Sequence, residues 1–76
     1  MTKEMFDLVY RVGAGIRGWD AYALWVARFS IQETLQTFRP ETAYEFCFRD
    51  LLRASHTILD RALTDRQARA QLWGEG

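Results

Sequence analysis

The stretch RPETAYEFCFRDLL, residues 39–52, decides the fold of this chain because it is helical where an α/β fold would need a strand. At 100° per residue, the apolar side chains of this stretch and its continuation share one broad arc: Tyr44, Cys47, Phe48, Leu51, Leu52, Ile58, Leu59 and Ala62. A polar stripe lies opposite this arc: Glu45, Arg49, Arg53, His56 and Asp60. The pattern predicts a helix over residues 40–63, with Pro40 in its first turn.

A second helix is predicted before this stretch, over residues 18–38. Asp20 lies near its start, where the helix dipole favours a carboxylate. The residue before a proline disfavours the α conformation, so this helix should end near Phe38. Further towards the N-terminus, the apolar side chains recur at helical spacing and predict a helix over residues 2–12, with Gly13 as its C-terminal cap.

A short fourth helix is predicted over residues 65–73. Thr64 and Gln67 have the T-x-x-Q spacing of a capping box, and Gly74 suits the end of the helix. We therefore expect one all-α domain over residues 1–76, a small three-helix bundle with a short fourth C-terminal helix.

Residues 12–18, VGAGIRG, place Gly13, Gly15 and Gly18 at the G-x-G-x-x-G spacing of a dinucleotide-binding site. Such a site also needs a strand before the glycines, a second parallel strand, and an acid about 20 residues further on. The second strand is missing, and Glu41, at about the right distance, falls at a helix start. We expect no nucleotide cofactor; the glycines should instead allow a tight reversal or a close helix crossing.

The composition excludes several partners. Lys and Arg residues number 10, equal to Asp and Glu, so no net charge favours nucleic acid or an anionic membrane. The longest apolar run, residues 21–27, is far shorter than the roughly 20 residues of a membrane span. The N-terminus carries acids where a signal peptide needs a basic start. The single cysteine, Cys47, fits a reducing compartment. We expect a complete, soluble, cytoplasmic protein of a bacterial or phage-infected cell.

No arrangement of residues predicts catalysis. His56 and Asp60, one helical turn apart, resemble an oriented general base, but Ser55 and Thr57 flank the histidine and point elsewhere. Cys47 lies on the opposite face of the same helix, and a single histidine does not complete a metal site. We expect a protein that is not an enzyme, with no cofactor and no metal, in which this pair belongs to a solvated helix face.

The segment WDAYALWVARF, residues 19–29, is apolar on two sides. One side is an ordinary core face: Leu24, Ala27, Ile31, Leu35 and Phe38. The other side is an arc with Trp19 at its margin: Tyr22, Trp25, Val26 and Phe29. Two explanations are open. Either the first helix packs on one side and the third on the other, or the arc is an exposed patch for a partner.

These observations lead us to expect a non-enzymatic module that associates with a partner protein sterically. The expected contact residues are aromatic and arginine side chains: Trp19, Tyr22, Trp25, Phe29, Arg49, Arg53, Arg69 and Trp73. A homodimer is a second possibility, because a chain of 76 residues with two apolar faces gains core by pairing.

In size and in its lack of catalytic motifs, the chain resembles phage and mobile-element inhibitors of host systems, anti-CRISPR proteins included. The resemblance implies an inhibitor that blocks the surface of a host defence complex. One alternative is an accessory or regulatory subunit of a bacterial complex. The other is a small nucleic-acid-binding protein that uses the arginines of the third and fourth helices: Arg49, Arg53, Arg61, Arg66 and Arg69. The neutral charge disfavours nucleic acid as a direct ligand.

Overall fold

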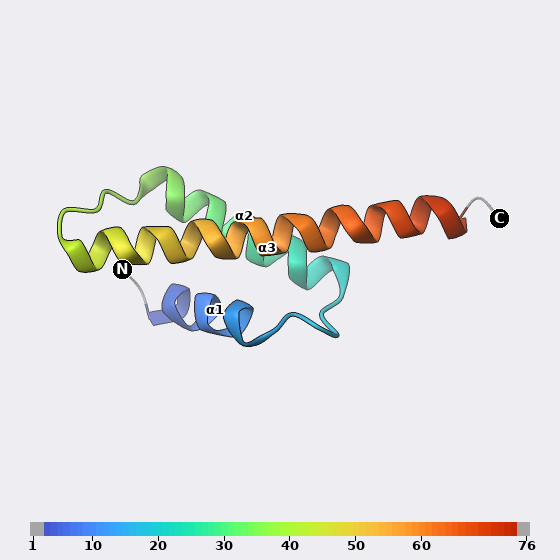
Figure 1. Ribbon diagram of the computed structural model, residues 1–76, viewed down its shortest axis with the longest axis horizontal. Helices are drawn as coiled ribbons and strands as arrows, with labels where there is room; N and C mark the ends of the chain where they lie inside the picture. Colours follow the sequence, from blue (N-terminus) through green and yellow to red (C-terminus); the bar gives the residue numbers. More distant parts are fainter. Residues whose placement is uncertain (1–2, 75–76) are drawn as a thin grey trace.

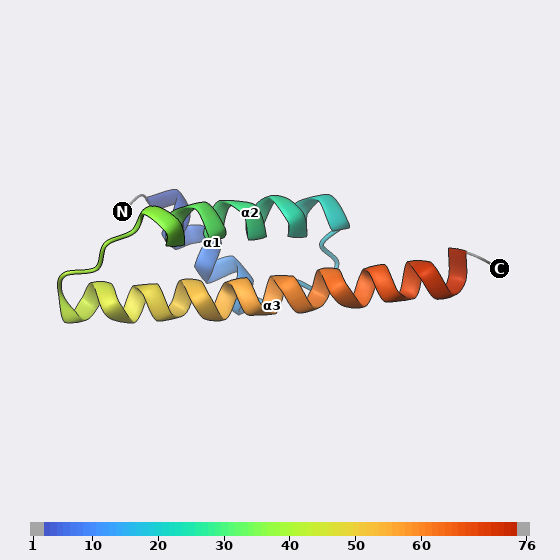
Figure 2. The ribbon, with the colours of Figure 1, turned by 90° about the horizontal axis from the view of Figure 1, so that it is seen from above.

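The computed structural model describes residues 3–74, with side chains through residue 69, and all regular structure in that range is helical. Helix α1 spans Lys3–Ala14, α2 spans Ala21–Thr37 and α3 spans Ala43–Gly74. Both shorter helices lie along α3, which extends past them at its C-terminal end (Figures 1 and 2). The predicted all-α fold with three main helices is therefore confirmed.

The predicted separate fourth helix over 65–73 is wrong, because α3 continues without a break through Thr64 and Asp65. A capping box starts a helix only where the preceding residues leave the helical conformation. No glycine or proline lies near residue 64 to force this. Threonine and aspartate cost about 0.7 kcal/mol or less each in a helix interior, so α3 continues through them.

The α3 helix begins with a capping box that the sequence reading overlooked. The Thr42 hydroxyl accepts a hydrogen bond from the Glu45 backbone N–H at 3.2 Å. The Glu45 carboxylate accepts from the backbone N–H of Thr42 and of Glu41, each at 3.1 Å. These two backbone donors lower the pKa of Glu45 below its ordinary value. Pro40 therefore lies in the loop before α3 and not in its first turn.

The glycines act through backbone conformation and not through close packing. Gly13, predicted as a cap, lies inside α1, which ends two residues later than expected. Gly15 and Gly18 have φ values of +134° and +90°, which favour glycine. A Cβ at any of these three positions would have no atom within 4 Å, so the predicted close helix crossing is wrong. The positive φ angles build the reversal between α1 and α2.

The core lies where α1 and α2 meet α3. Eight apolar side chains are buried: Val9, Val12, Leu24, Ala27, Ile31, Phe48, Leu52 and Leu59. Helix α2 begins at the N-cap Asp20, whose carboxylate accepts from the Ala23 N–H at 2.7 Å, close to the predicted start. Both α1 and α2 pack mainly against α3, so α1 does not bury the side of α2 that faces away from α3.

The molecule is elongated, and its surface is large for its size. It measures 52 × 20 × 15 Å, a length set by α3, whose 32 residues extend about 48 Å. Its accessible surface is 5958 Å², whereas a compact monomer of 8.9 kDa exposes about 4,800 Å². The excess of roughly 1,100 Å² is comparable to one partner's share of a large interface.

Candidate protein-interaction surface

Four side chains form what we call the α2 aromatic face: Tyr22, Trp25, Val26 and Phe29. They lie on the side of α2 opposite the buried Leu24, Ala27 and Ile31. Tyr22 is 75% exposed and Trp25 is 51% exposed. The rings of Trp25 and Phe29 stack with centroids 5.4 Å apart and planes 14° from parallel. A stacked pair of this kind contributes about 0.5–1.5 kcal/mol, so the two rings are presented to solvent together.

The α2 aromatic face is exposed because α1 packs elsewhere. Helix α1 places Phe6 in a stack with Phe48 of α3, with ring centroids 6.0 Å apart. Between α1 and α2 runs an open groove of about 790 Å³, whose walls include Tyr10 of α1 and Tyr22 and Val26 of α2. Of the two explanations that the sequence left open, burial of this arc between two helices is therefore wrong, and exposure is correct.

A second groove, of about 440 Å³, borders the aromatic face on its other side. It lies between α2 and the C-terminal half of α3, and Tyr22, Trp25 and Leu63 contribute to its walls. The Arg66 guanidinium donates a hydrogen bond to the Trp19 carbonyl and ties the start of α2 to α3. Tyr22 and Trp25 therefore stand on a ridge between two hollows, a shape that suits insertion into a partner.

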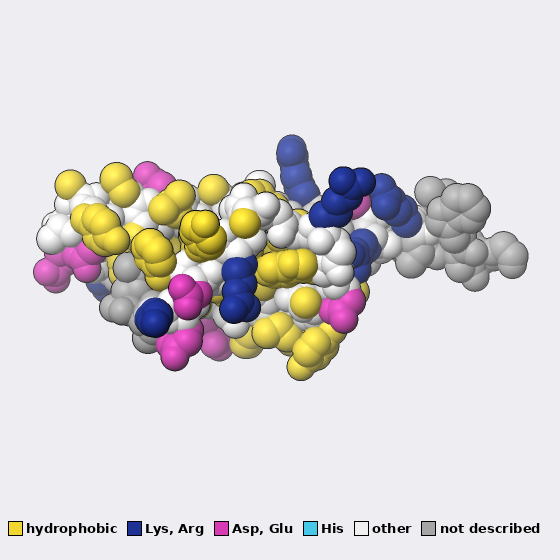
Figure 3. Space-filling model, turned by 90° about the horizontal axis from the view of Figure 1, so that it is seen from below, with side chains coloured by type: hydrophobic (Ala, Val, Ile, Leu, Met, Phe, Trp, Pro, Cys, Tyr) yellow, Lys and Arg dark blue, Asp and Glu magenta, His cyan; other side chains and the backbone are white. Residues whose placement is uncertain are grey.

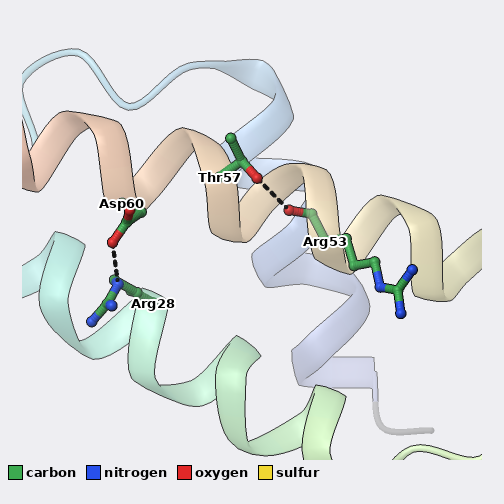
Figure 4. A network of polar contacts seen from close by, with 4 residues as sticks. All are labelled: Arg28, Arg53, Thr57 and Asp60. Carbon is green, nitrogen blue, oxygen red and sulfur yellow. Dashed lines mark hydrogen bonds and ion pairs between the residues drawn. The ribbon is translucent and has the colours of Figure 1, made fainter.

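Trp19 and the expected arginines do not gather on this face. Trp19 is partly buried against the core. Arg49 lies over the Phe46 ring at 5.0 Å and within 3.5 Å of Asp50. Arg53 is exposed but extends away from α2 (Figure 4). Of the expected contact residues, the structure therefore unites only the three aromatics of α2.

The remaining two expected residues belong to the C-terminal end of α3. Arg69 is exposed, one helical turn beyond Arg66, and so lies at the same end of the molecule as Tyr22. Trp73 falls on described helix, but its side chain lies outside the described residues. At 100° per residue, however, Arg69 projects from the side of α3 that carries Leu51, and it does not border the groove beside Tyr22 and Trp25.

Two of the residues considered for catalysis, Asp60 and Thr57, make structural hydrogen bonds. Asp60 accepts a hydrogen bond from Arg28 Nε at 2.9 Å, which joins α3 to α2 (Figure 4). The Thr57 hydroxyl donates to the Arg53 carbonyl at 3.1 Å, within the helix. His56 Nε2 is buried and has no hydrogen-bond partner among the described residues. Asp60 is thus engaged by Arg28 and not by the histidine one turn before it.

The described part of the chain offers little for metals or membranes. No three His, Cys, Asp or Glu side chains within it are placed to hold a metal ion together. None of its helices combines the length and apolar character needed to cross a bilayer. Its prominent surface feature is exposed apolar side chains: ten large ones are exposed, more than the eight apolar residues that are buried.

The structure exposes a second apolar surface, on α3, that the sequence did not lead us to predict. The broad apolar arc predicted for the third helix divides in the structure: Phe48, Leu52 and Leu59 are buried, while Tyr44, Leu51 and Ile58 are exposed. Apolar side chains gather over α1 and the N-terminal half of α3, and basic ones lie towards the C-terminal end (Figure 3). The seven-residue spacing of the exposed members was the available signal.

Comparison with known proteins gives no match to a family model, a curated protein or a solved structure.

Proposed function

We propose that the protein is a non-enzymatic binding module that docks on a partner protein through the α2 aromatic face. The observation that carries the proposal is the exposed, stacked pair of Trp25 and Phe29, on the same face of α2 as Tyr22, which borders a groove on each side. Tryptophan and tyrosine are the residues that most often dominate binding energy at interface centres.

The size of the face supports this role. Aromatic side chains bury about 150–250 Å² each, so the exposed parts of Tyr22, Trp25 and Phe29 offer roughly 350 Å². An exposed apolar patch of this size is at the level at which patches on monomers often serve in recognition. It would fill the centre of a standard interface of about 800 Å² per partner, with polar side chains at its rim.

The charge supports steric association. The formal net charge is zero, so long-range electrostatic attraction contributes little to binding. The partner surface that fits best is therefore an apolar hollow with a polar edge.

The proposed module takes one of two biological forms. In the first it is a phage or mobile-element inhibitor that covers a working surface of a host defence complex. In the second it is an accessory subunit that is retained in a bacterial complex. Both use the same face, and activity of the partner measured with and without the protein distinguishes them: an inhibitor lowers that activity, whereas an accessory subunit does not.

Direct nucleic-acid binding is not favoured by the geometry. At 100° per residue, the arginines of α3 point in different directions around the helix axis: Arg49, Arg53, Arg61, Arg66 and Arg69. Arg66 is also engaged with the Trp19 carbonyl, and Arg49 with the Phe46 ring. A phosphate backbone is bound by several cations on one side of a protein, and these arginines do not share one side of α3.

The test is affinity purification from the source cell with three forms of the tagged protein. The wild type should retain a specific protein, and the double variant Trp25→Ala/Phe29→Ala should lose it. The matched control is Phe46→Ala, because Phe46 is an aromatic residue of α3 outside this face and is 43% exposed, close to the 47% of Phe29. Equal retention by all three forms would contradict the proposal.

A further inference from the structure

Five of the apolar residues exposed on α3 lie on one side of the helix and form what we call the α3 outer stripe: Tyr44, Cys47, Leu51, Ala54 and Ile58. They follow one another at intervals of three and four residues, the spacing of a coiled-coil seam. All five are exposed, although Leu51 and Ile58 are residues that a helix normally buries. Within this molecule, α1 and α2 pack on another side of α3 and leave the stripe uncovered.

Helix α1 forms one wall beside the stripe. Phe6 and Tyr10 of α1 are exposed there, next to Leu51 of α3. These three side chains contribute to an apolar groove of about 380 Å³ between the two helices. In Figure 3 apolar side chains gather along the N-terminal half of α3, beside charged side chains. The groove and the stripe together provide one continuous surface that a further helix could cover.

We propose that the α3 outer stripe binds the same stripe of a second copy of this chain, with the two α3 helices antiparallel around a two-fold axis. The area agrees with this occupant. The exposed parts of Phe6, Tyr10, Tyr44, Leu51 and Ile58 come to roughly 560 Å² if each side chain is taken as about 200 Å². A stable dimer needs about 800 Å² per copy, which the backbone and the polar rim complete.

The side-chain sizes favour an antiparallel register. When Leu51 lies opposite Ala54 of the second copy, Cys47 lies opposite Ile58, and each large residue meets a small one. Two-fold symmetry repeats these pairs on the other side of the axis. A parallel pair would instead place Ala54 against Ala54 and leave a void between the helices. The antiparallel register fills the seam more evenly.

The charges favour the same register. Arg61 is exposed and continues the stripe three residues after Ile58. In the antiparallel pair it lies over Tyr44 of the second copy, where a cation–π contact forms, and Glu41 follows nearby. In a parallel pair, Arg61 would face Arg61 and repel it. The antiparallel arrangement therefore converts a repulsion into an attraction.

The first test is the mass of the protein in solution over a concentration series, by light scattering after gel filtration. The wild type should approach twice 8.9 kDa. Leu51→Asp should raise the dimer Kd at least about 30-fold, because a charge replaces an apolar side chain at the centre of the seam. The matched control is Phe29→Asp, the same kind of change at a residue 47% exposed, against 52% for Leu51, but on the α2 aromatic face.

Three results would overturn the inference. The first is a monomeric wild type at every concentration. The second is a dimer that Leu51→Asp leaves intact, and the third is a dimer that Phe29→Asp disrupts instead. Far-ultraviolet circular dichroism shows whether each variant keeps its helices, and Ile58→Glu supplies a second disruption of the stripe should Leu51→Asp unfold.

The second test determines the orientation through Cys47, the single cysteine of the chain. In the proposed register the two Cys47 side chains are about 16 Å apart along the helix axis, so oxidation should not join them. Ile58→Cys places a new thiol opposite Cys47, and peptide mapping should find a Cys47 bond to position 58. Arg53→Cys, off the stripe, should give none. Efficient Cys47–Cys47 bonding in the wild type would overturn the antiparallel arrangement.

The dimer and the proposed function can be tested independently of each other. The α3 outer stripe and the α2 aromatic face share no residue and lie on different helices, although Tyr10 contributes to the groove beside each of them. Loss of partner capture in Trp25→Ala/Phe29→Ala tests only the proposed function. A change of mass in Leu51→Asp tests only the dimer.

Discussion

Replacement of Gly15 by alanine tests how the turn after α1 is built. The φ angle of Gly15 is +134°, a conformation that costs a residue with a Cβ about 1–3 kcal/mol. Alanine offsets about 0.4–1 kcal/mol of this cost, because it has less conformational freedom than glycine in the unfolded chain. No atom lies within 4 Å of the added Cβ, so steric crowding adds nothing. We expect a net loss of about 1–2 kcal/mol in the free energy of unfolding.

Gly13 provides the matched control two residues earlier. It lies inside α1, has no positive φ angle, and would also place its Cβ in open space. Alanine in a helix interior is more stable than glycine by about 0.5–1 kcal/mol. Gly13→Ala should therefore raise the free energy of unfolding, whereas Gly15→Ala should lower it.

Thermal unfolding followed by circular dichroism measures both variants. A change of 1 kcal/mol shifts Tm by about 4–8 °C in a domain of this size. Gly15→Ala should lower Tm by about 5–15 °C and Gly13→Ala should raise it by about 2–8 °C. Shifts of the same sign in the two variants, or an unchanged Tm for Gly15→Ala, would refute the reasoning about backbone conformation.

Three further changes have defined outcomes. Leu59→Ala should lower the free energy of unfolding by about 2–5 kcal/mol in a denaturant titration, because Leu59 is fully buried; a loss below about 1 kcal/mol would contradict its place in the core. The pKa of Glu45 is lowered in the folded state, so the stabilisation by its carboxylate is present above pH 4.5, the ordinary pKa, and is lost as the pH falls through the folded pKa. Glu45→Gln should flatten this part of the curve of unfolding free energy against pH. An unchanged curve would argue against the capping box. Arg28 and Asp60 are both substantially exposed, so a double-mutant cycle should give a coupling of about 1 kcal/mol or less that shrinks in high salt; a larger, salt-independent coupling would contradict an exposed pair.

The helical fold followed from hydrophobic periodicity. Leu24, Ala27 and Ile31 were placed on the core face of the second helix, and all three are buried. The pre-proline restriction placed the end of this helix at Phe38, one residue beyond the Thr37 end of α2. Local patterns were sufficient here because these three residues recur at helical spacing on one side of the helix.

The length of α3 could not be predicted in the same way. Two stretches fit the capping-box pattern, one from Thr42 to Glu45 and one from Thr64 to Gln67, and only the first begins a helix. At the first stretch, Pro40 and the loop before Thr42 interrupt the helical conformation. At the second stretch, the helix is not interrupted. A capping motif is therefore informative only together with a signal that ends the preceding helix.

The sequence predicted which residues form the candidate surface, but it did not predict that they are exposed. The arc with Tyr22, Trp25 and Phe29 could be read as core or as contact surface, because a helical wheel does not show which neighbour covers which side. Its exposure depends on the packing of α1 against α3, through contacts such as Phe6 with Phe48. Such long-range contacts are set by tertiary structure and leave no local periodic signal.

The most direct test of the proposed function is calorimetric titration of the purified partner with the wild type, Trp25→Ala and Phe46→Ala. We predict that Trp25→Ala weakens binding at least about 30-fold, as expected of an anchor worth about 2 kcal/mol. Its unfolding free energy should change by at most about 1 kcal/mol, because alanine's helix propensity offsets the lost ring stacking. Phe46→Ala should bind like the wild type. Unchanged affinity in Trp25→Ala would contradict the assignment of the α2 aromatic face as the docking surface.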